Sequence, residues 1–87
     1  MNNHQAENIA IAALQYIAAH ETYFDHFLAS SGMEAEQIKH AITTVDFQIS
    51  ILDFICLDES LLLSFCQTAE IEPAEPYKAF QYLSYHN

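Results

Sequence analysis

The stretch that decides the fold reads VDFQISILDFICLDESLLLSFCQTA (residues 45–69). Its first half is apolar on almost every side, which predicts a central helix that ends at about Leu57. Its second half predicts an amphipathic helix over residues 59–69, with Asp58 as the N-cap. The apolar face of this second helix is expected to consist of Leu61, Leu62, Phe65, Cys66 and Ala69.

The same pattern occurs earlier in the chain, because residues 9–42 align with residues 47–80 without a gap. The identical pairs are Ile11/Ile49, Leu14/Leu52, Ile17/Ile55, Glu21/Glu59, Phe27/Phe65, Glu34/Glu72 and Ala41/Ala79. Any two amphipathic helices aligned in phase would share apolar positions, but the two glutamate pairs also match at the boundaries between helices. The sequence therefore predicts an internal duplication of two tandem three-helix units, packed with approximate two-fold pseudosymmetry.

We therefore expect a single all-α domain of residues 1–87 with six short helices. The first unit contains helices at about residues 4–19, 21–31 and 35–42, and Gly32 should end the second of them in a left-handed conformation. In the second unit, residues 43–46 resemble a capping box that begins the fourth helix. The fifth helix covers residues 59–69, and Glu72-Pro73 opens a sixth that ends near the chain terminus.

Charge narrows the range of partners. The chain has a net charge of −10, with twelve acidic residues, two lysines and no arginine. Such a surface repels phosphates, so we expect no nucleic-acid partner and no binding to an anionic membrane. The N-terminus lacks the basic residues of a signal peptide, and no apolar run is long enough to span a bilayer. These features favour a cytoplasmic protein, in which Cys56 and Cys66 should be reduced.

The sequence contains few candidate catalytic or metal-binding residues. His20, Asp25 and His26 lie close together in the sequence and could form a metal or acid–base site, which makes a metal-binding protein or a small enzyme the alternative function. The duplication argues against this site, because the positions equivalent to His20 and Asp25 are Asp58 and Leu63. A structural cap at position 20 or 58 explains both units better. We expect no catalytic residue, no metal ligand and no cofactor.

Residues 27–40 also resemble a helix-turn-helix. A DNA reader needs basic residues on its second helix, and Lys39 is the only lysine there, preceded by two glutamates. A helix-turn-helix-like regulator is therefore the third and least favoured function.

The second unit has become apolar where the first stayed polar or small. Leu57 stands where the first unit has Ala19, and Leu63 stands where it has Asp25. Added apolar surface of this kind usually marks an interface, unless a terminal helix folds over it. The candidate interface residues are Leu57, Leu63, Tyr77, Tyr82 and Tyr85. The sequence thus favours a small acidic, non-enzymatic protein–protein interaction module that binds a protein partner or pairs with itself as a homodimer.

Residues 27–33 and 51–65 resemble a small alphaproteobacterial family known as a domain of unknown function, number thirty-five seventy-two. The second segment is the more specific, with an apolar helix followed by Asp58-Glu59, three leucines, Ser64 and Phe65. The resemblance covers most of residues 6–83. It implies a bacterial, cytoplasmic and helical protein, and it transfers neither an activity nor site residues. The family usually has Asp at position 20 or 21 and an arginine-bearing last helix where residues 77–82 stand here.

Overall fold

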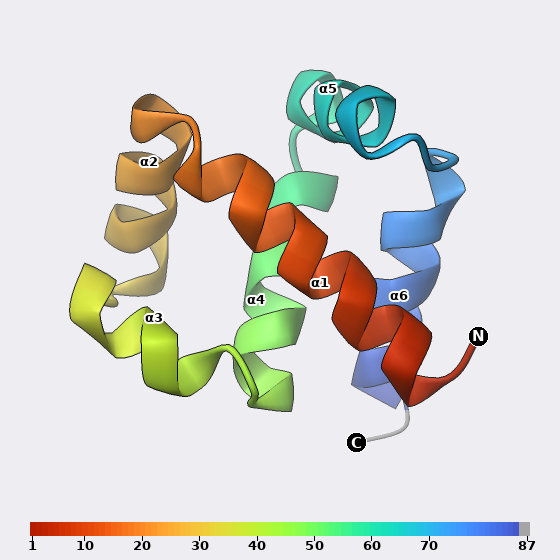
Figure 1. Cartoon of the computed structure of the whole chain (residues 1–87), viewed down its shortest axis with the longest axis horizontal. Helices are drawn as coiled ribbons and strands as arrows, with labels where there is room; N and C mark the ends of the chain where they lie inside the picture. Colours follow the sequence, from red (N-terminus) through yellow and green to blue (C-terminus); the bar gives the residue numbers. More distant parts are fainter. Residues whose placement is uncertain (86–87) are drawn as a thin grey trace.

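The computed structural model describes residues 1–85, which form six helices (Figure 1). They are α1 (Asn3–Ala18), α2 (Glu21–Ser31), α3 (Ala35–Ala41), α4 (Val45–Cys56), α5 (Glu59–Ala69) and α6 (Ala74–Tyr85). The all-α prediction is confirmed. The predicted bounds of α2 and α5 agree with the structure, whereas α6 begins one residue after Pro73.

Side-chain caps explain where several helices begin. The side-chain oxygen of Asn2 accepts a hydrogen bond from the Gln5 N–H (2.8 Å), and Gln5 Oε1 accepts one from the Asn2 N–H (3.0 Å). These reciprocal bonds form a capping box at α1. At α4 the Thr44 hydroxyl accepts from the Phe47 N–H at 3.3 Å. The predicted capping box at residues 43–46 is therefore wrong, because the third helical residue is Phe47, which cannot return the bond.

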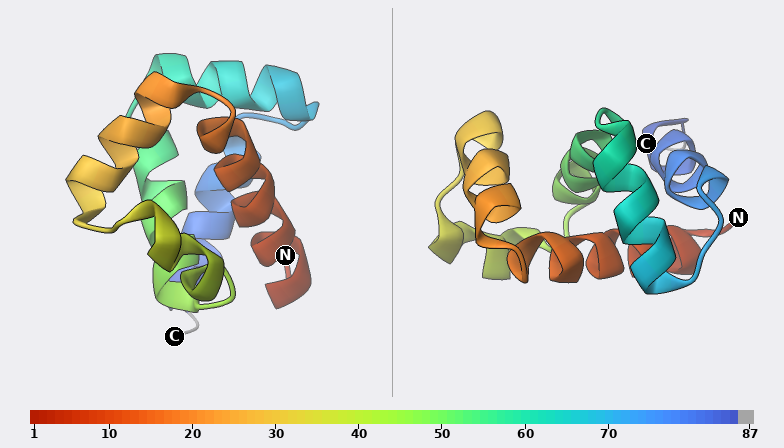
Figure 2. Two further views of the ribbon diagram at one scale, coloured as in Figure 1. Left: turned by 60° about the vertical axis from the view of Figure 1, so that its left-hand side comes forward. Right: turned by 90° about the horizontal axis from the view of Figure 1, so that it is seen from above.

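The core lies where α1 crosses α4 and α6 (Figures 1 and 2). The buried residues of α1 are mostly small, and α6 also buries Ala79, so the two helices can approach each other closely. As predicted, α4 is central, since it packs against α1, α2, α5 and α6. Its buried residues are Phe47, Gln48, Ile51, Leu52 and Ile55. Full burial of each aliphatic side chain among them contributes roughly 1.5–3 kcal/mol to folding.

The backbone repeats between the two units at helix boundaries. Gly32, after α2, has φ 72°, and its counterpart Glu70, after α5, has φ 58°. Both residues therefore adopt the left-handed conformation, as predicted for Gly32. The N-caps also match, with φ/ψ of −122°/100° at His20 and −119°/106° at Asp58.

The predicted two-fold pseudosymmetry is nevertheless not confirmed. The first two helices of each unit pack in corresponding ways, α1 on α2 and α4 on α5. The third helices do not, because α6 packs along both α1 and α4, whereas α3 has no comparably extensive contact with another helix in residues 1–85. Length is one reason, since α3 has 7 residues and α6 has 12.

Membrane-spanning helices are absent from the described part of the chain. No helix within residues 1–85 is both long enough and apolar enough to cross a bilayer.

Candidate functional site

His20 lies at the N-cap of α2, but its side chain does not cap that helix. Its Nδ1 atom lies 2.8 Å from the carbonyl oxygen of Tyr16, so a proton on Nδ1 is donated back to α1. The imidazole ring also contacts the rings of Tyr16 and Tyr23, with centroid distances of 4.5 and 5.6 Å. Both predicted cap positions are N-caps in the structure, but only Asp58 caps with its side chain, its Oδ1 accepting from the Leu61 N–H at 3.1 Å.

The histidine site considered from the sequence does not form a ligand set. Asp25 and His26 are exposed on α2, while His20 turns back towards α1. Within residues 1–85, no three His, Cys, Asp or Glu side chains gather in a group that could hold a metal ion. In this part of the chain, therefore, no group of side chains supports the metal-binding alternative.

An apolar groove lies between α1 and α5. Tyr16 and Phe65 form its aromatic wall, with an edge-on ring contact at a centroid distance of 5.8 Å, and His20 stands at its rim. The groove has a volume of about 350 Å³ and is lined mainly by apolar atoms. The sequence did not reveal this groove, because Tyr16 and Phe65 belong to different units and occupy non-equivalent positions.

The predicted interface residues lie in the α4–α5 connection, in α5 and in α6. Leu57, Leu63, Tyr77 and Tyr85 are 79%, 48%, 52% and 89% exposed, whereas Tyr82 packs partly against the core. Leu57 lies in the connection between α4 and α5, and Leu63 lies within α5, the helix at the top of Figure 1. Tyr85 ends α6 at the opposite edge of the molecule, because α6 runs away from α5. A helix does not fold over Leu57, so the alternative of a covering terminal helix is wrong there.

A small groove between α2 and α4 adjoins Leu57. Phe27 and Phe54 meet edge to face in it, with ring centroids 5.3 Å apart. Its volume is about 150 Å³, enough for roughly one apolar side chain. The other lining residues are Ser30, Ser31, Ser50, Asp53 and Leu57. We call this feature the α2–α4 groove. Because Phe27 is almost fully buried, the accessible lining consists mainly of the three serines, Asp53, Phe54 and the exposed Leu57.

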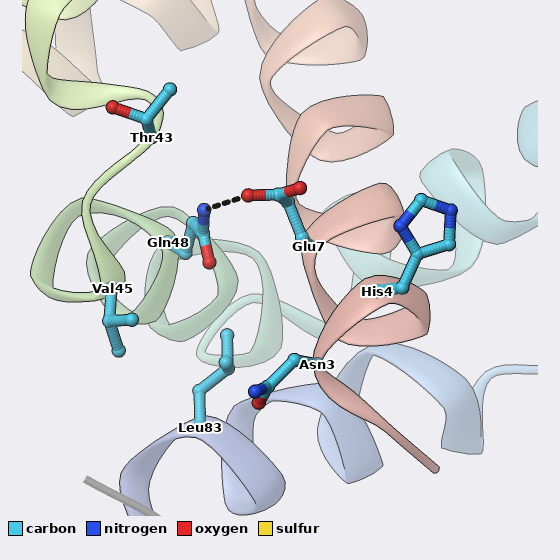
Figure 3. A pocket seen from close by; sticks show the side chains of 7 residues that line it. All are labelled: Asn3, His4, Glu7, Thr43, Val45, Gln48 and Leu83. Atoms are coloured by element: carbon cyan, nitrogen blue, oxygen red, sulfur yellow. Dashed lines mark hydrogen bonds between the residues drawn. The ribbon is translucent and has the colours of Figure 1, made fainter.

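Gln48 is the one buried polar side chain of the described residues, with 2% exposure. Its Nε2 atom donates to Glu7 Oε2 at 3.2 Å and to the Ile42 carbonyl oxygen at 3.1 Å. The amide borders a cavity of about 650 Å³ between the first turns of α1, the start of α4 and the end of α6 (Figure 3). We call it the Gln48 cavity; it is lined by Asn3, His4, Glu7, Thr43, Val45, Gln48 and Leu83. The sequence gives no sign of this cavity, because residues from three separate helices contribute to its walls.

Both cysteines are free thiols that resist ionisation. Burial, together with the nearby negative charge of Asp53 and the second thiol, raises the pKa of Cys56 to about 11. Burial also raises the pKa of Cys66. Since the thiolate is the reactive form, neither residue has the properties of a catalytic nucleophile at neutral pH.

A family model described as "Protein of unknown function (DUF3572)" matches residues 3–86. The match extends across all six helices and confirms the resemblance carried by residues 27–33 and 51–65. No curated protein and no solved structure matches the chain.

Proposed function

Because the chain belongs to the DUF3572 family, whose description carries no activity, we propose its function from its own surface. We propose that it is a non-enzymatic interaction module that binds a basic, partly apolar segment of a protein partner. The binding surface consists of the α2–α4 groove, Leu57 and Leu63. The observation that carries the proposal is the position of Leu57, which is 79% exposed and lines a groove together with Phe54 and Asp53.

The groove supplies an anchor point for such a partner. Interfaces gain most of their affinity from a few apolar residues that fill desolvated pockets. The α2–α4 groove can receive one such side chain beside Phe54, while the exposed Leu57 adds further apolar contact. Leu63, which is 48% exposed on α5, supplies a second exposed apolar side chain.

Charge selects the partner. Asp53 lines the groove, and Asp58 and Glu59 are exposed between Leu57 and Leu63. Two copies of this chain, each with a net charge of −10, would repel each other, whereas a segment with Lys or Arg beside its apolar anchor would be attracted. These charges favour a basic partner over a homodimer.

The duplication provides matched variants for the test. Leu57→Ala and Leu63→Asp introduce the residues that the first unit has at the equivalent positions, Ala19 and Asp25. Both leucines are exposed, so stability should change by less than about 0.5 kcal/mol. Asp25→Leu adds an exposed leucine elsewhere and serves as the control for nonspecific stickiness.

The experiment is affinity capture from the native cell with each variant, followed by titration of the purified captured protein. We expect the wild type and Asp25→Leu to retain a basic protein, and Leu57→Ala and Leu63→Asp to weaken its binding at least tenfold. Equal binding by all four proteins would refute the proposed surface. A dimer in light scattering that both leucine variants dissociate would instead establish self-association.

A further inference from the structure

The Gln48 cavity lies near the start of α4, away from the α4–α5 connection and from α5 (Figures 1 and 3). Both hydrogen atoms of the Gln48 amide are used, because Nε2 donates to Glu7 Oε2 and to the Ile42 carbonyl. Rotating the amide by half a turn would place its oxygen against two acceptor oxygens. The orientation of the amide is therefore fixed by its neighbours.

This fixed orientation leaves the Gln48 oxygen turned into the cavity. Figure 3 shows Oε1 directed away from Glu7, towards Asn3 and Leu83. It accepts no hydrogen bond from any group within residues 1–85, although the residue is only 2% exposed. No side-chain nitrogen or oxygen of the described residues is both fully buried and without a partner, so Oε1 is in contact with the open cavity, where a donor that entered could reach it.

The surrounding groups specify the kind of donor. Glu7 accepts the Gln48 bond with one oxygen, and its second oxygen remains open to a ligand. Neither lysine of the chain lines this cavity, and His4 is the one basic residue among its lining side chains. The Asn3 amide adds a further acceptor, while Val45 and Leu83 supply apolar walls.

We propose that the Gln48 cavity is a binding site for an alkylammonium or alkylguanidinium group. The cationic head donates to Glu7 Oε1, Gln48 Oε1 and the Asn3 amide oxygen, and its short aliphatic stem packs between Val45 and Leu83. Charge-assisted hydrogen bonds are about twice as strong as neutral ones, so the carboxylate dominates the affinity. The overall negative charge of the protein also raises the local concentration of cations.

The test is a titration of the isotope-labelled protein with n-butylammonium chloride at constant ionic strength, followed by nuclear magnetic resonance. We expect saturable shifts of the Gln48 side-chain amide signals and of the Asn3 and Glu7 backbone signals. n-Butanol, which has the same stem and no charge, should bind at least tenfold more weakly. Equal binding of butanol, or no saturable shift at Gln48, would overturn the proposal.

Glu7→Gln tests the carboxylate directly, because the amide can still accept from Gln48 but carries no charge. We expect it to weaken butylammonium binding about tenfold or more. Glu21→Gln removes the same charge from the exposed start of α2 and should leave the affinity within about twofold, since exposed charges act weakly through salt. Equal losses in the two variants would mean that the cation responds only to net charge, which contradicts a built site.

A blocked lysine, Nα-acetyl-lysine N-methylamide, distinguishes the two sources of this chemistry. Binding of both probes supports a lysine side chain of a protein as the natural occupant. Binding of butylammonium alone supports a free small amine. Leu57 and Leu63 are untouched in both experiments, so failure here leaves the proposed partner surface unaffected.

Discussion

Replacing Glu70 by glycine should stabilise the protein. Glu70 follows α5 with φ 58°, a left-handed conformation that costs a residue with a Cβ atom roughly 1–2 kcal/mol. Its carboxylate also lies at the C-terminal end of a helix, where a negative charge costs about 0.3–1 kcal/mol. The side chain is exposed and makes no hydrogen bond within residues 1–85, so the substitution removes no favourable contact.

Glycine also increases the conformational entropy of the unfolded chain, which offsets about 0.4–1 kcal/mol of the gain. The free energy of unfolding of Glu70→Gly should therefore rise by about 1 kcal/mol, equivalent to roughly 4–8 °C in Tm for a domain of this size. Urea unfolding followed by circular dichroism measures the change, and the slope with denaturant should stay constant.

The equivalent position in the first unit provides the reverse experiment. A Cβ added at Gly32 would meet no heavy atom within 4 Å, so Gly32→Ala introduces backbone strain without a steric clash. We expect this variant to lose about 1 kcal/mol. Glu70→Gln separates the charge from the backbone and should recover only the smaller, electrostatic part. A neutral or destabilising Glu70→Gly with an unchanged slope would refute the assignment of strain to this residue.

Four further predictions concern the helix cap, a thiol and the core. Asp58→Ala should lower the free energy of unfolding by about 1 kcal/mol in urea titrations, whereas Asp58→Asn should keep most of it because the amide oxygen can still cap α5. The folded-state pKa of Cys56, about 11, exceeds its ordinary value of 9.0, so its contribution to stability is complete below pH 9 and is lost as the pH rises towards 11. The difference between the unfolding curves of wild type and Cys56→Ala should show this decline, and a constant difference would contradict it. Leu52→Ala should cost about 2–5 kcal/mol by opening a cavity in the core, against less than about 0.5 kcal/mol for the exposed Leu57→Ala. Ala13→Ile should cost about 1–3 kcal/mol by overpacking α1, and a stability equal to wild type would show that space remains beside this helix.

Much of the fold could be predicted because its signals are local. Gly32 ends α2, Asp58 caps α5, and the nearly continuous apolar surface of α4 places that helix at the centre. His20 shows the limit of this reasoning. Its backbone conformation matches that of Asp58, but the direction of its side chain depends on Tyr16 and Tyr23, which contact the ring only after α1 and α2 have packed.

The candidate sites were harder to predict because each depends on contacts between distant segments. Leu57 and Leu63 could be identified by comparing the units, and both are exposed. Tyr82 could not be assigned in this way, because its burial depends on where α6 packs. The burial and hydrogen bonding of Gln48 could not be predicted for a similar reason, since its partner Glu7 lies 41 residues away in the chain.

The duplication itself explains why the two units are not interchangeable in space. Ala10 and Ala13 of α1 occupy the positions that Gln48 and Ile51 occupy in α4, and all four are buried. A perfect two-fold axis between α1 and α4 would place equal residues against each other. Instead, the small residues of α1 leave space that α6 enters, with Ala79 buried against the same core. α6 thereby takes a place that α3 cannot share, and its end closes one wall of the Gln48 cavity. Loss of symmetry and formation of the cavity therefore have one physical origin, the difference in side-chain volume between the two equivalent helices.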